Sequence, residues 1–196
     1  MSCSCGHHHH THDHHHEDET GIPIILSRPM AALTGRLICA DAGQVMTALS
    51  LLPGHVDLSR AEPGCLRFDA WQDDDPLIWH ISELFIDEDA FEAHQSRNRA
   101  SEWGRESTAI ARDFQRHEVQ PLIRPASASD NTAIEALHRA TGAQSDLHPS
   151  LVVSAAGTII GHFPLGQSDA RPVIHPKAQA LGIDTAILKV TGAQPA

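Results

Sequence analysis

The strongest constraint on the fold of this chain is the order of strand-like and helix-like segments between residues 31 and 123. Ala32–Ala40 has the pattern of a strand, and the apolar residues of Gly43–Leu52 recur at helical spacing. The turn signal Glu62–Gly64 introduces Cys65–Trp71, whose side chains alternate with the period of two that is typical of a strand. A strand, a helix and a second strand are therefore expected in this order.

The same alternation continues to the end of this region. Leu77–Phe85 is expected to form a strand, and Asp87–Arg97 a helix whose acidic first turn suits the positive end of the helix dipole. Ser101–Ala111 continues as a helix, and Arg112–Ile123 is expected to close the region as a strand. The order β-α-β-β-α-β predicts a ferredoxin-like α+β fold over residues 31–123.

A second unit of different texture is expected at residues 132–196. Pro125–Asn131 is rich in Ser and Ala, as in a linker. Thr132–Glu135 matches a capping box that opens a helix ending at Gly142. Further strand-like and helical segments follow, including a strand expected at Thr185–Val190, so this C-terminal domain is α/β-like. Its sequence indicates no family and no role.

Residues 1–20 form a third part, rich in histidine and without Lys or Arg. Thr11 and Asp13 interrupt the histidine run, which favours a native segment over a purification tag. Such a polar segment has nothing to bury and is expected to be disordered without metal. Imidazole and thiolate ligands suit Zn, Ni or Cu, and the irregular spacing favours a flexible site over a structural one. The candidate ligands are Cys3, Cys5, His7, His8, His9, His10, His12, His14, His15 and His16.

The charge and hydropathy of the chain exclude some classes of partner. The net charge of −11 comes without a basic stripe, which disfavours nucleic acid and anionic membranes as partners. No apolar run has the length of a transmembrane helix, and the N-terminus lacks the basic and then apolar pattern of a secretory signal. We therefore expect a cytoplasmic protein with reduced thiols.

The segment Ser59–Gly104 resembles the antibiotic biosynthesis monooxygenase family, including its quinol monooxygenase branch. Two motifs carry the resemblance: "EPGCLRF", which opens a strand at Glu62, and E-x-F-x-D-x-x-A-F-x-x-H, which runs from Glu83 to His94. The similarity covers about residues 31–120. It implies a ferredoxin-like α+β barrel that is normally closed by dimerisation. We therefore expect a homodimer, and the alternative is that the C-terminal domain covers the open sheet face and makes a pseudo-dimer within one chain.

The resemblance also implies an activity. Members of the family oxidise quinols or polycyclic aromatics with O₂, typically without metal or flavin. A phenol that loses its proton can pass one electron to O₂, so the protein needs a base or donor and a cavity that excludes water. The expected partners are therefore a small aromatic substrate and O₂, with no cofactor for this domain.

Candidate site residues follow from the faces that the pattern predicts. His94 shares a helical face with core residues, where it is either structural or a base in a pocket. Glu83 lies on an apolar strand face, and the alternative to a pocket role is an ion pair with Arg97 or Arg60. Trp103 and Trp79 belong either to the core or to a stacking wall. The predicted catalytic residues are His94, Glu83 and Trp103, and the predicted substrate-binding residues are Trp79, Phe85, Arg60 and Arg97.

Two other functions remain open. The protein could handle Zn, Ni or Cu and use the barrel only as a dimerisation scaffold, because one fold hosts many functions. A cavity beside His94 and Glu83 would favour the enzyme, and a packed interior would favour the scaffold. Haem-degrading relatives of this fold use an axial His with a Trp and an Asn. His94 and Trp103 match two of these types, but the opening strand has no Asn, which makes haem cleavage the less favoured reading.

Overall fold

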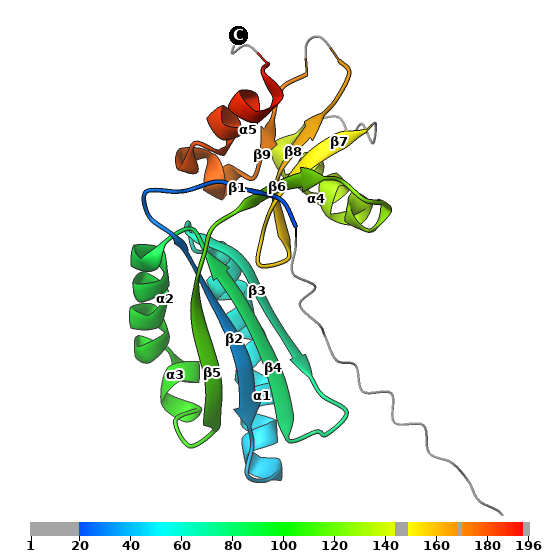
Figure 1. Cartoon of the computed structure of the whole chain (residues 1–196). Helices are drawn as coiled ribbons and strands as arrows, with labels where there is room; N and C mark the ends of the chain where they lie inside the picture. Colours follow the sequence, from blue (N-terminus) through cyan, green and yellow to red (C-terminus); the bar gives the residue numbers. More distant parts are fainter. Residues whose placement is uncertain (1–19, 144–148, 168–169, 194–196) are drawn as a thin grey trace, which may run out of the picture.

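The structure is a computed structural model that describes residues 20–143, 149–167 and 170–193 of the 196. Residues 1–19, which include every predicted metal ligand from Cys3 to His16, lie outside the described residues. The described part forms two antiparallel sheets, each with its own helices (Figure 1).

The first sheet and its helices have the predicted element order. The elements are β2 (Met30–Ile38), α1 (Ala42–Ala61), β3 (Cys65–Gln72), β4 (Ile78–Phe85), α2 (Glu88–Ala100), α3 (Glu102–Glu106) and β5 (Ala111–Val119). The strands are ordered β3-β4-β2-β5 and are all antiparallel. The predicted ferredoxin-like α+β fold is confirmed. The second helix is shorter than expected, because α3 ends at Glu106 and the chain turns into β5.

Local signals fix where the two long helices begin. The Asp41 carboxylate accepts a hydrogen bond from the Gln44 amide at the start of α1. Asp87 does the same for the Ala90 amide at the start of α2. An N-cap of this kind satisfies an amide that has no partner within the helix. Both helices cover the same face of the first sheet, and we call the opposite side its helix-free face.

The second sheet has strand order β1-β6-β7-β8-β9. Its strands are β1 (Ile22–Pro23), β6 (Leu122–Pro125), β7 (Ser150–Ala155), β8 (Thr158–Pro164) and β9 (Val173–Ile174). Its helices are the 3₁₀ helix η1 (Ala128–Asp130), α4 (Asn131–Thr141), the 3₁₀ helix η2 (Pro176–Leu181) and α5 (Ile183–Thr191). We refer to β6 and everything after it as the C-terminal unit.

Three local predictions are wrong. The single closing strand over Arg112–Ile123 is instead β5 and β6, which belong to different sheets. Pro121 lies between them and has no amide hydrogen for a ladder. The expected linker Pro125–Asn131 contains η1, and the capping box lies at Ser127 and Asp130 rather than at Thr132–Glu135.

The expected strand at Thr185–Val190 is also wrong, because these residues lie in α5. Glycines with positive φ precede and follow this helix, Gly182 at its N-cap and Gly192 at its C-cap. Ile183 and Ile187 are four residues apart and pack into the apolar cluster of the second sheet. The end of α4 at Gly142, a left-handed C-cap, agrees with the prediction.

The C-terminal unit packs on one end of the helix-free face. Met30, Ala32 and Leu84 of the first sheet share an apolar cluster with residues of the second sheet such as Val153 and Phe163. Beside this cluster, Arg67 of β3 reaches the turn between β7 and β8. Its Nη1 donates to the Ala156 carbonyl and the Thr158 hydroxyl at 2.5 and 2.7 Å. The two sheets are therefore joined by both apolar and polar contacts.

Within the described ranges, no helix combines the length and the apolar character needed to cross a membrane.

Replacing Leu84 tests the packing between the two units. Leu84 is fully buried there. Leu84→Ala should lower the free energy of unfolding by about 2–5 kcal/mol, the usual cost of such a truncation in a core. Ile78→Ala is the matched control, because Ile78 lies on the same strand and face but is only partly buried. Its cost in urea denaturation should be clearly smaller, and equal losses would contradict the packing described.

Candidate functional site

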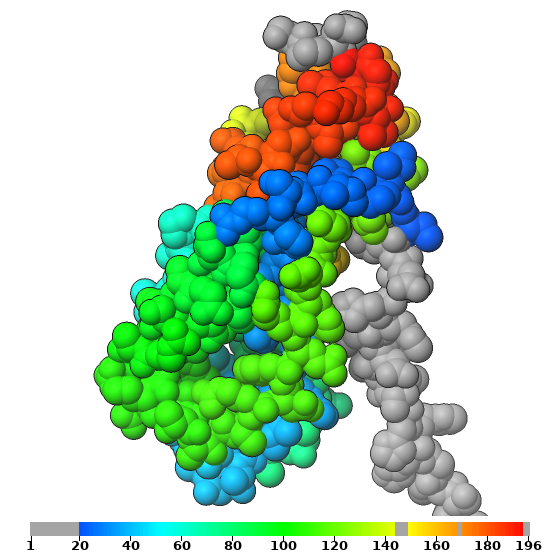
Figure 2. All heavy atoms as spheres, turned by 60° about the vertical axis from the view of Figure 1, so that its left-hand side comes forward, coloured from blue at the N-terminus to red at the C-terminus, as the bar shows by residue number. Residues whose placement is uncertain are grey.

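A cavity of about 300 Å³ lies between the helices and the first sheet. It opens between α2 and β5, where a hollow is visible in Figure 2. The volume is at the lower end of the range for small-molecule sites, and most of the lining is apolar. The lining residues are Leu33, Leu37, Leu52, His55, Phe68, Ile81, Glu83, Phe91, Gln95, Asn98, Trp103, Arg112 and Phe114.

A glycine allows two strands of the cavity wall to approach each other closely. Gly35 of β2 lies between Leu33 and Leu37, which both line the cavity. A Cβ atom at Gly35 would come within 2.2 Å of the Asp113 carbonyl, so β5 can approach β2 this closely only beside a glycine.

Glu83 brings a carboxyl group to the cavity wall. Its side chain is almost fully buried, and its Oε2 has no hydrogen-bond partner. Burial raises the pKa of Glu83 to about 8, with a further rise from the nearby Glu62 and a smaller opposing effect of Arg97. The carboxyl is therefore mainly protonated at neutral pH. The alternative ion pair does not form, because Arg97 binds Glu62 and Arg60 binds Asp69.

His94 lies directly behind Glu83. Its Nε2 is 3.9 Å from Glu83 Oε2, and its Nδ1 is 2.9 Å from Glu62 Oε2. Burial lowers the pKa of His94 and the bond to Glu62 opposes this, so the ring is neutral at pH 7. Arg97 Nη2 also approaches Nδ1, at 3.3 Å. We assign the ring proton to Nδ1, which makes the shorter contact with a carboxylate, and this leaves the Nε2 lone pair facing Glu83.

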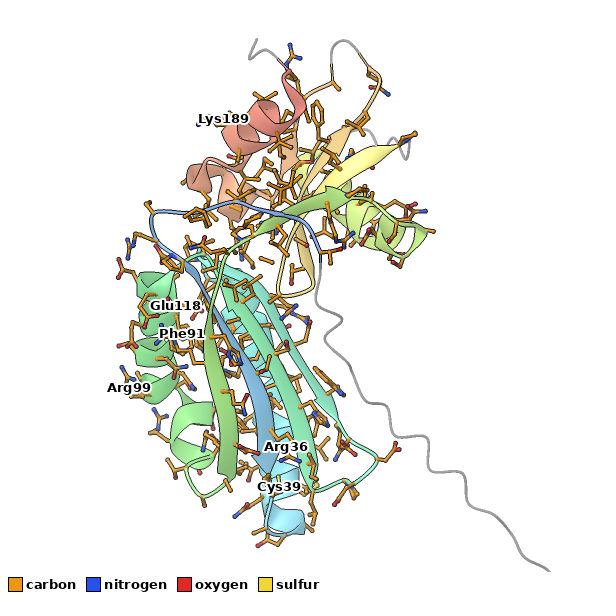
Figure 3. The ribbon with its side chains drawn as sticks, in the orientation of Figure 1. Arg36, Cys39, Phe91, Arg99, Glu118 and Lys189 are labelled. Atoms are coloured by element: carbon orange, nitrogen blue, oxygen red, sulfur yellow. The ribbon has the colours of Figure 1, made fainter. Side chains whose placement is uncertain are left out.

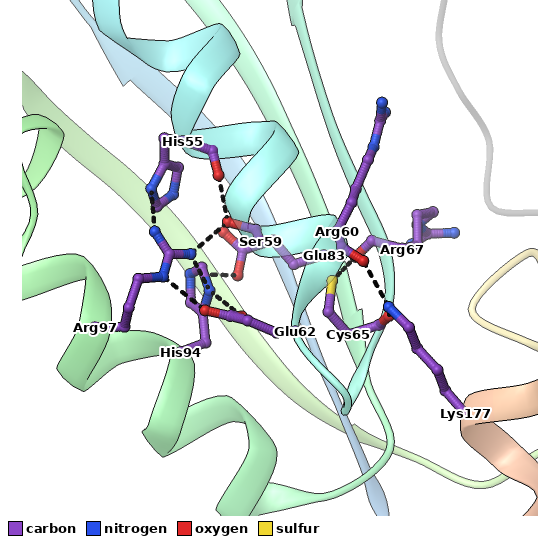
Figure 4. Close-up of polar contacts among 10 residues, drawn as sticks. All are labelled: His55, Ser59, Arg60, Glu62, Cys65, Arg67, Glu83, His94, Arg97 and Lys177. Atoms are coloured by element: carbon purple, nitrogen blue, oxygen red, sulfur yellow. Dashed lines mark hydrogen bonds and ion pairs between the residues drawn. The ribbon is translucent and has the colours of Figure 1, made fainter.

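Arg97 connects α2 to α1 (Figure 4). Its Nε donates to Glu62 Oε1 at 2.7 Å, and its Nη2 donates to the Ser59 hydroxyl at 2.7 Å. Nη1 lies 3.2 Å from His55 Nδ1, which must accept because a guanidinium has only donors. Burial and the charge of Arg97 lower the pKa of His55 to about 3, so this ring is neutral.

His55, Ser59 and Glu62 were not among the predicted site residues. These residues are spaced i, i+4 and i+7, which places them on one stripe of a helix and at its end. A polar stripe on an otherwise apolar helix face is the signal that would have found them.

Trp103 forms another wall of the cavity. Its ring is buried, and its centroid is 5.9 Å from that of His55. The short helix α3 is capped by Ser101, whose hydroxyl accepts from the Gly104 amide. A Cβ at Gly104 would come within 2.0 Å of the Asn98 carbonyl, so only glycine permits this approach of α3 to α2. The Asn98 Oδ1 atom is also buried without a partner.

The remaining predicted residues lie outside the cavity lining. Trp79 and Arg60 flank a separate groove of about 260 Å³ beside α1. Phe85 is buried in the core, where its ring contacts those of Phe91 and His94. Arg97 belongs to the polar network behind the cavity. The substrate-binding roles of Trp79, Phe85, Arg60 and Arg97 stay predictions.

Among the residues with a described position, no group of three or more His, Cys, Asp or Glu side chains is arranged to hold a metal ion. The candidate ligands of the tail lie outside these residues.

Comparison with known proteins identifies the domain that carries this cavity. Residues 36–106 match the model of a family described as antibiotic biosynthesis monooxygenase, which confirms the resemblance stated from Ser59–Gly104. No curated protein matches the chain.

Several solved structures are similar to part of the chain. One is SnoaB, a cofactor-independent oxygenase from Streptomyces nogalater, with 13% identity over 45% of this chain and 91% of that chain and a TM-score of 0.40. A putative antibiotic biosynthesis monooxygenase from Nitrosomonas europaea has 18% identity over 48% and 94%, with a TM-score of 0.39. A Bacteroides thetaiotaomicron protein of unknown function, a possible oxidoreductase, has 13% identity over 47% and 99%, also with a TM-score of 0.39.

The buried Glu83 carboxyl should make stability depend on pH. Its pKa is about 8 in the folded chain and 4.5 without its environment, so the folded state binds more protons between these values. The free energy of unfolding therefore falls as pH rises from 4.5 to 8, because the folded state must keep a buried proton or bury a charge. Glu83→Gln should be of similar stability to the unmodified chain near pH 4 and more stable by roughly 2–4 kcal/mol above pH 8.

Urea denaturation of both proteins at a series of pH values measures this difference. Glu118→Gln is the control, because Glu118 is exposed on β5 (Figure 3). A difference for Glu83→Gln that does not change with pH would contradict a raised pKa.

Proposed function

We propose that this domain is a cofactor-independent monooxygenase that oxidises a quinol or polycyclic aromatic substrate with O₂. The observation that carries the proposal is the Glu83 carboxyl, buried with an unpartnered oxygen at the wall of an apolar cavity. The match of residues 36–106 to a monooxygenase family supports the reaction class.

The lining fits a planar aromatic molecule that carries hydroxyl groups. Trp103, Phe68, Phe91 and Phe114 offer ring faces and edges to such a molecule. Glu83 Oε2 and Asn98 Oδ1 lack partners and can accept hydrogen bonds from substrate hydroxyls. A molecule with both features satisfies two buried acceptors and fills apolar space.

The proposed chemistry begins with removal of a phenolic proton. Glu83 in its carboxylate form is the base, and the phenolate passes one electron to O₂. Recombination at a ring carbon forms a C–O bond, and cleavage of the O–O bond then leaves one oxygen on the ring. Overall, a phenol with a free ring C–H reacts with O₂ to give a quinone and water. No electron donor besides the substrate is needed.

His94 and Glu62 offer a route for the proton. Glu83 Oε2 faces the lone pair of His94 Nε2 across 3.9 Å, a gap that rotation of the carboxyl can close. His94 Nδ1 in turn contacts Glu62, whose side chain is 21% exposed. A proton taken up by Glu83 can therefore pass through the imidazole to a carboxylate at the surface. This assigns catalytic roles to Glu83 and His94 and a stacking role to Trp103.

The two alternative functions receive less support. The cavity beside Glu83 is the feature that favours an enzyme over a barrel that serves only as scaffold for a metal-handling tail. An axial haem ligand must present a ring nitrogen to the cavity, but His94 turns Nδ1 to Glu62 and Nε2 to Glu83. Storage or delivery of Zn, Ni or Cu rests on the tail alone.

Oxygen uptake with a panel of quinols and hydroxyanthracene-like compounds tests the activity. The rate should rise with pH through about 8, because Glu83 becomes a base as it loses its proton. Glu83→Gln should lower kcat/KM by about 10²–10⁴-fold and abolish this rise. Glu118→Gln should change neither. Absence of uptake with every compound, or an unchanged pH profile in Glu83→Gln, would refute the proposal.

A homodimer is proposed through the part of the helix-free face that the C-terminal unit leaves open. Trp71 and Ile38 lie on this part and are 43% and 37% exposed. Trp71 stacks on His80, so the patch is ordered. Apolar groups of this size on a sheet face favour burial against a partner.

Sedimentation should show a dimer for the full chain and a monomer for Trp71→Glu, because an unpaired charge buried in an interface is costly to desolvate. Leu58→Glu is the matched control, since Leu58 is 57% exposed on α1 and away from this face. A full chain that sediments as a monomer would contradict the proposed assembly.

A further inference from the structure

A lysine of the C-terminal unit reaches the segment that joins α1 to β3. Lys177 lies in η2, and its Nζ donates to the Arg60 carbonyl at 2.6 Å and to the Cys65 carbonyl at 2.9 Å (Figure 4). Arg60 is in the last turn of α1, where free carbonyls and the helix dipole both favour a cation. One ammonium group thus bridges the two ends of the turn that contains Glu62.

This turn is held tightly on its other sides. The Cys65 amide donates to the Glu62 carbonyl at 3.2 Å, and the Ile86 amide donates to the Gly64 carbonyl at 2.9 Å. A Cβ at Gly64 would lie 2.3 Å from that of Ala90, so the turn is pressed against α2. The Glu62 carboxylate projects from this turn to His94 Nδ1 and Arg97 Nε.

The Lys177 side chain is itself well placed for the contact. Its backbone amide donates to His175 Nδ1 at 3.2 Å, and the next residue, Ala178, is fully buried in the apolar cluster of the second sheet. The position of the lysine is therefore set by the core of the C-terminal unit.

We propose that Lys177 is a positioning residue through which the C-terminal unit fixes the Glu62 turn and so holds the Glu62 carboxylate against His94 and Arg97. The C-terminal unit is then part of the construction of the site, although its own side chains do not line the cavity described above. The inference about geometry stands on the contacts, and only its effect on turnover rests on the proposed function.

A contact that merely joins the two units would act differently. Arg67 also spans the boundary, but its bonds end on Ser82 and on the turn between β7 and β8, at the helix-free face. Lys177 instead ends two residues from Glu62 on one side and three on the other. Loss of Lys177 should therefore change the contact between Glu62 and His94.

The titration of the His94 ring, followed by NMR in the full chain, measures this effect. The contact with Glu62 raises the pKa of His94 against the effect of burial. Lys177→Met removes the two hydrogen bonds and keeps the apolar stem, so Glu62 is held less well and the pKa of His94 should fall. Loss of a positive charge alone would act in the opposite sense and raise it. The direction of the shift therefore separates positioning from a direct charge effect.

Lys189→Met is the matched control. Lys189 is the other lysine of the chain, and it is exposed on α5 away from the first sheet (Figure 3). This variant should leave the His94 titration unchanged. In a Glu62→Gln background, Lys177→Met should no longer lower the pKa of His94, because the carboxylate that Lys177 positions is already gone.

Turnover gives an independent measurement. Lys177→Met should lower kcat on the order of tenfold with little change in KM, since misplacement of a group distant from the substrate acts on the chemical step. If the unmodified chain oxidises no tested compound, the proposed function fails while the titration still decides the role of Lys177.

Lys177→Gln provides a second variant should Lys177→Met not fold. It keeps one donor group, and its His94 pKa should lie between that of the unmodified chain and that of a chain without the bond. A His94 pKa that is unchanged or raised in a folded Lys177 variant would overturn the proposal.

Discussion

The ion pair between Arg97 and Glu62 is the interaction on which the site depends. It joins α2 to the end of α1, and the other nitrogens of the same guanidinium bind Ser59 and His55. A buried polar network is stable only when its donors and acceptors have hydrogen-bond partners. Here most of these partners are other side chains of the same network. The network holds the two helices at a fixed separation, and the cavity lies beside it. Glu83 is left outside the network, which explains why its carboxyl is both protonated and available.

Sequence periodicity predicted the faces on which Glu83 and His94 lie. Glu83 lies on the helix-covered face with Ile81 and Phe85, and His94 is buried beside Phe91, as their spacing indicated. Periodicity could not predict which acidic residue forms an ion pair with each arginine. Arg97 and Glu62 are 35 residues apart, and their pairing depends on how α1 and α2 pack. The bonds of Arg97 to His55 and Ser59 depend on the same packing of α1 against α2.

The errors in the predicted elements have a common origin. Local pattern gave a continuous strand from Arg112 to Ile123 and a strand at Thr185–Val190, and both assignments fail where the second sheet is built. That sheet combines β1, from before the first domain, with four strands from after it. The pairing of β1 with β6 joins residues about a hundred positions apart, and no window of a few residues contains it. The first domain was easier to predict because the order of its helices and strands is that of a ferredoxin-like fold, which supplies the long-range pairing of β2 with β4 and β5.

The contact of Gly104 with the Asn98 carbonyl separates two properties of the cavity that usually change together. Trp103, next to this glycine, sets the width of one wall, whereas the titrating groups Glu83 and His94 come from β4 and α2. A Cβ atom at position 104 would meet the Asn98 carbonyl, so a larger residue there would first act on the packing of α3 against α2. The range of molecules admitted and the proton chemistry available to them are thus encoded at different places in the chain. Under the proposed function, changes in α3 would alter which substrates enter, while Glu83 and His94 on β4 and α2 would stay the same.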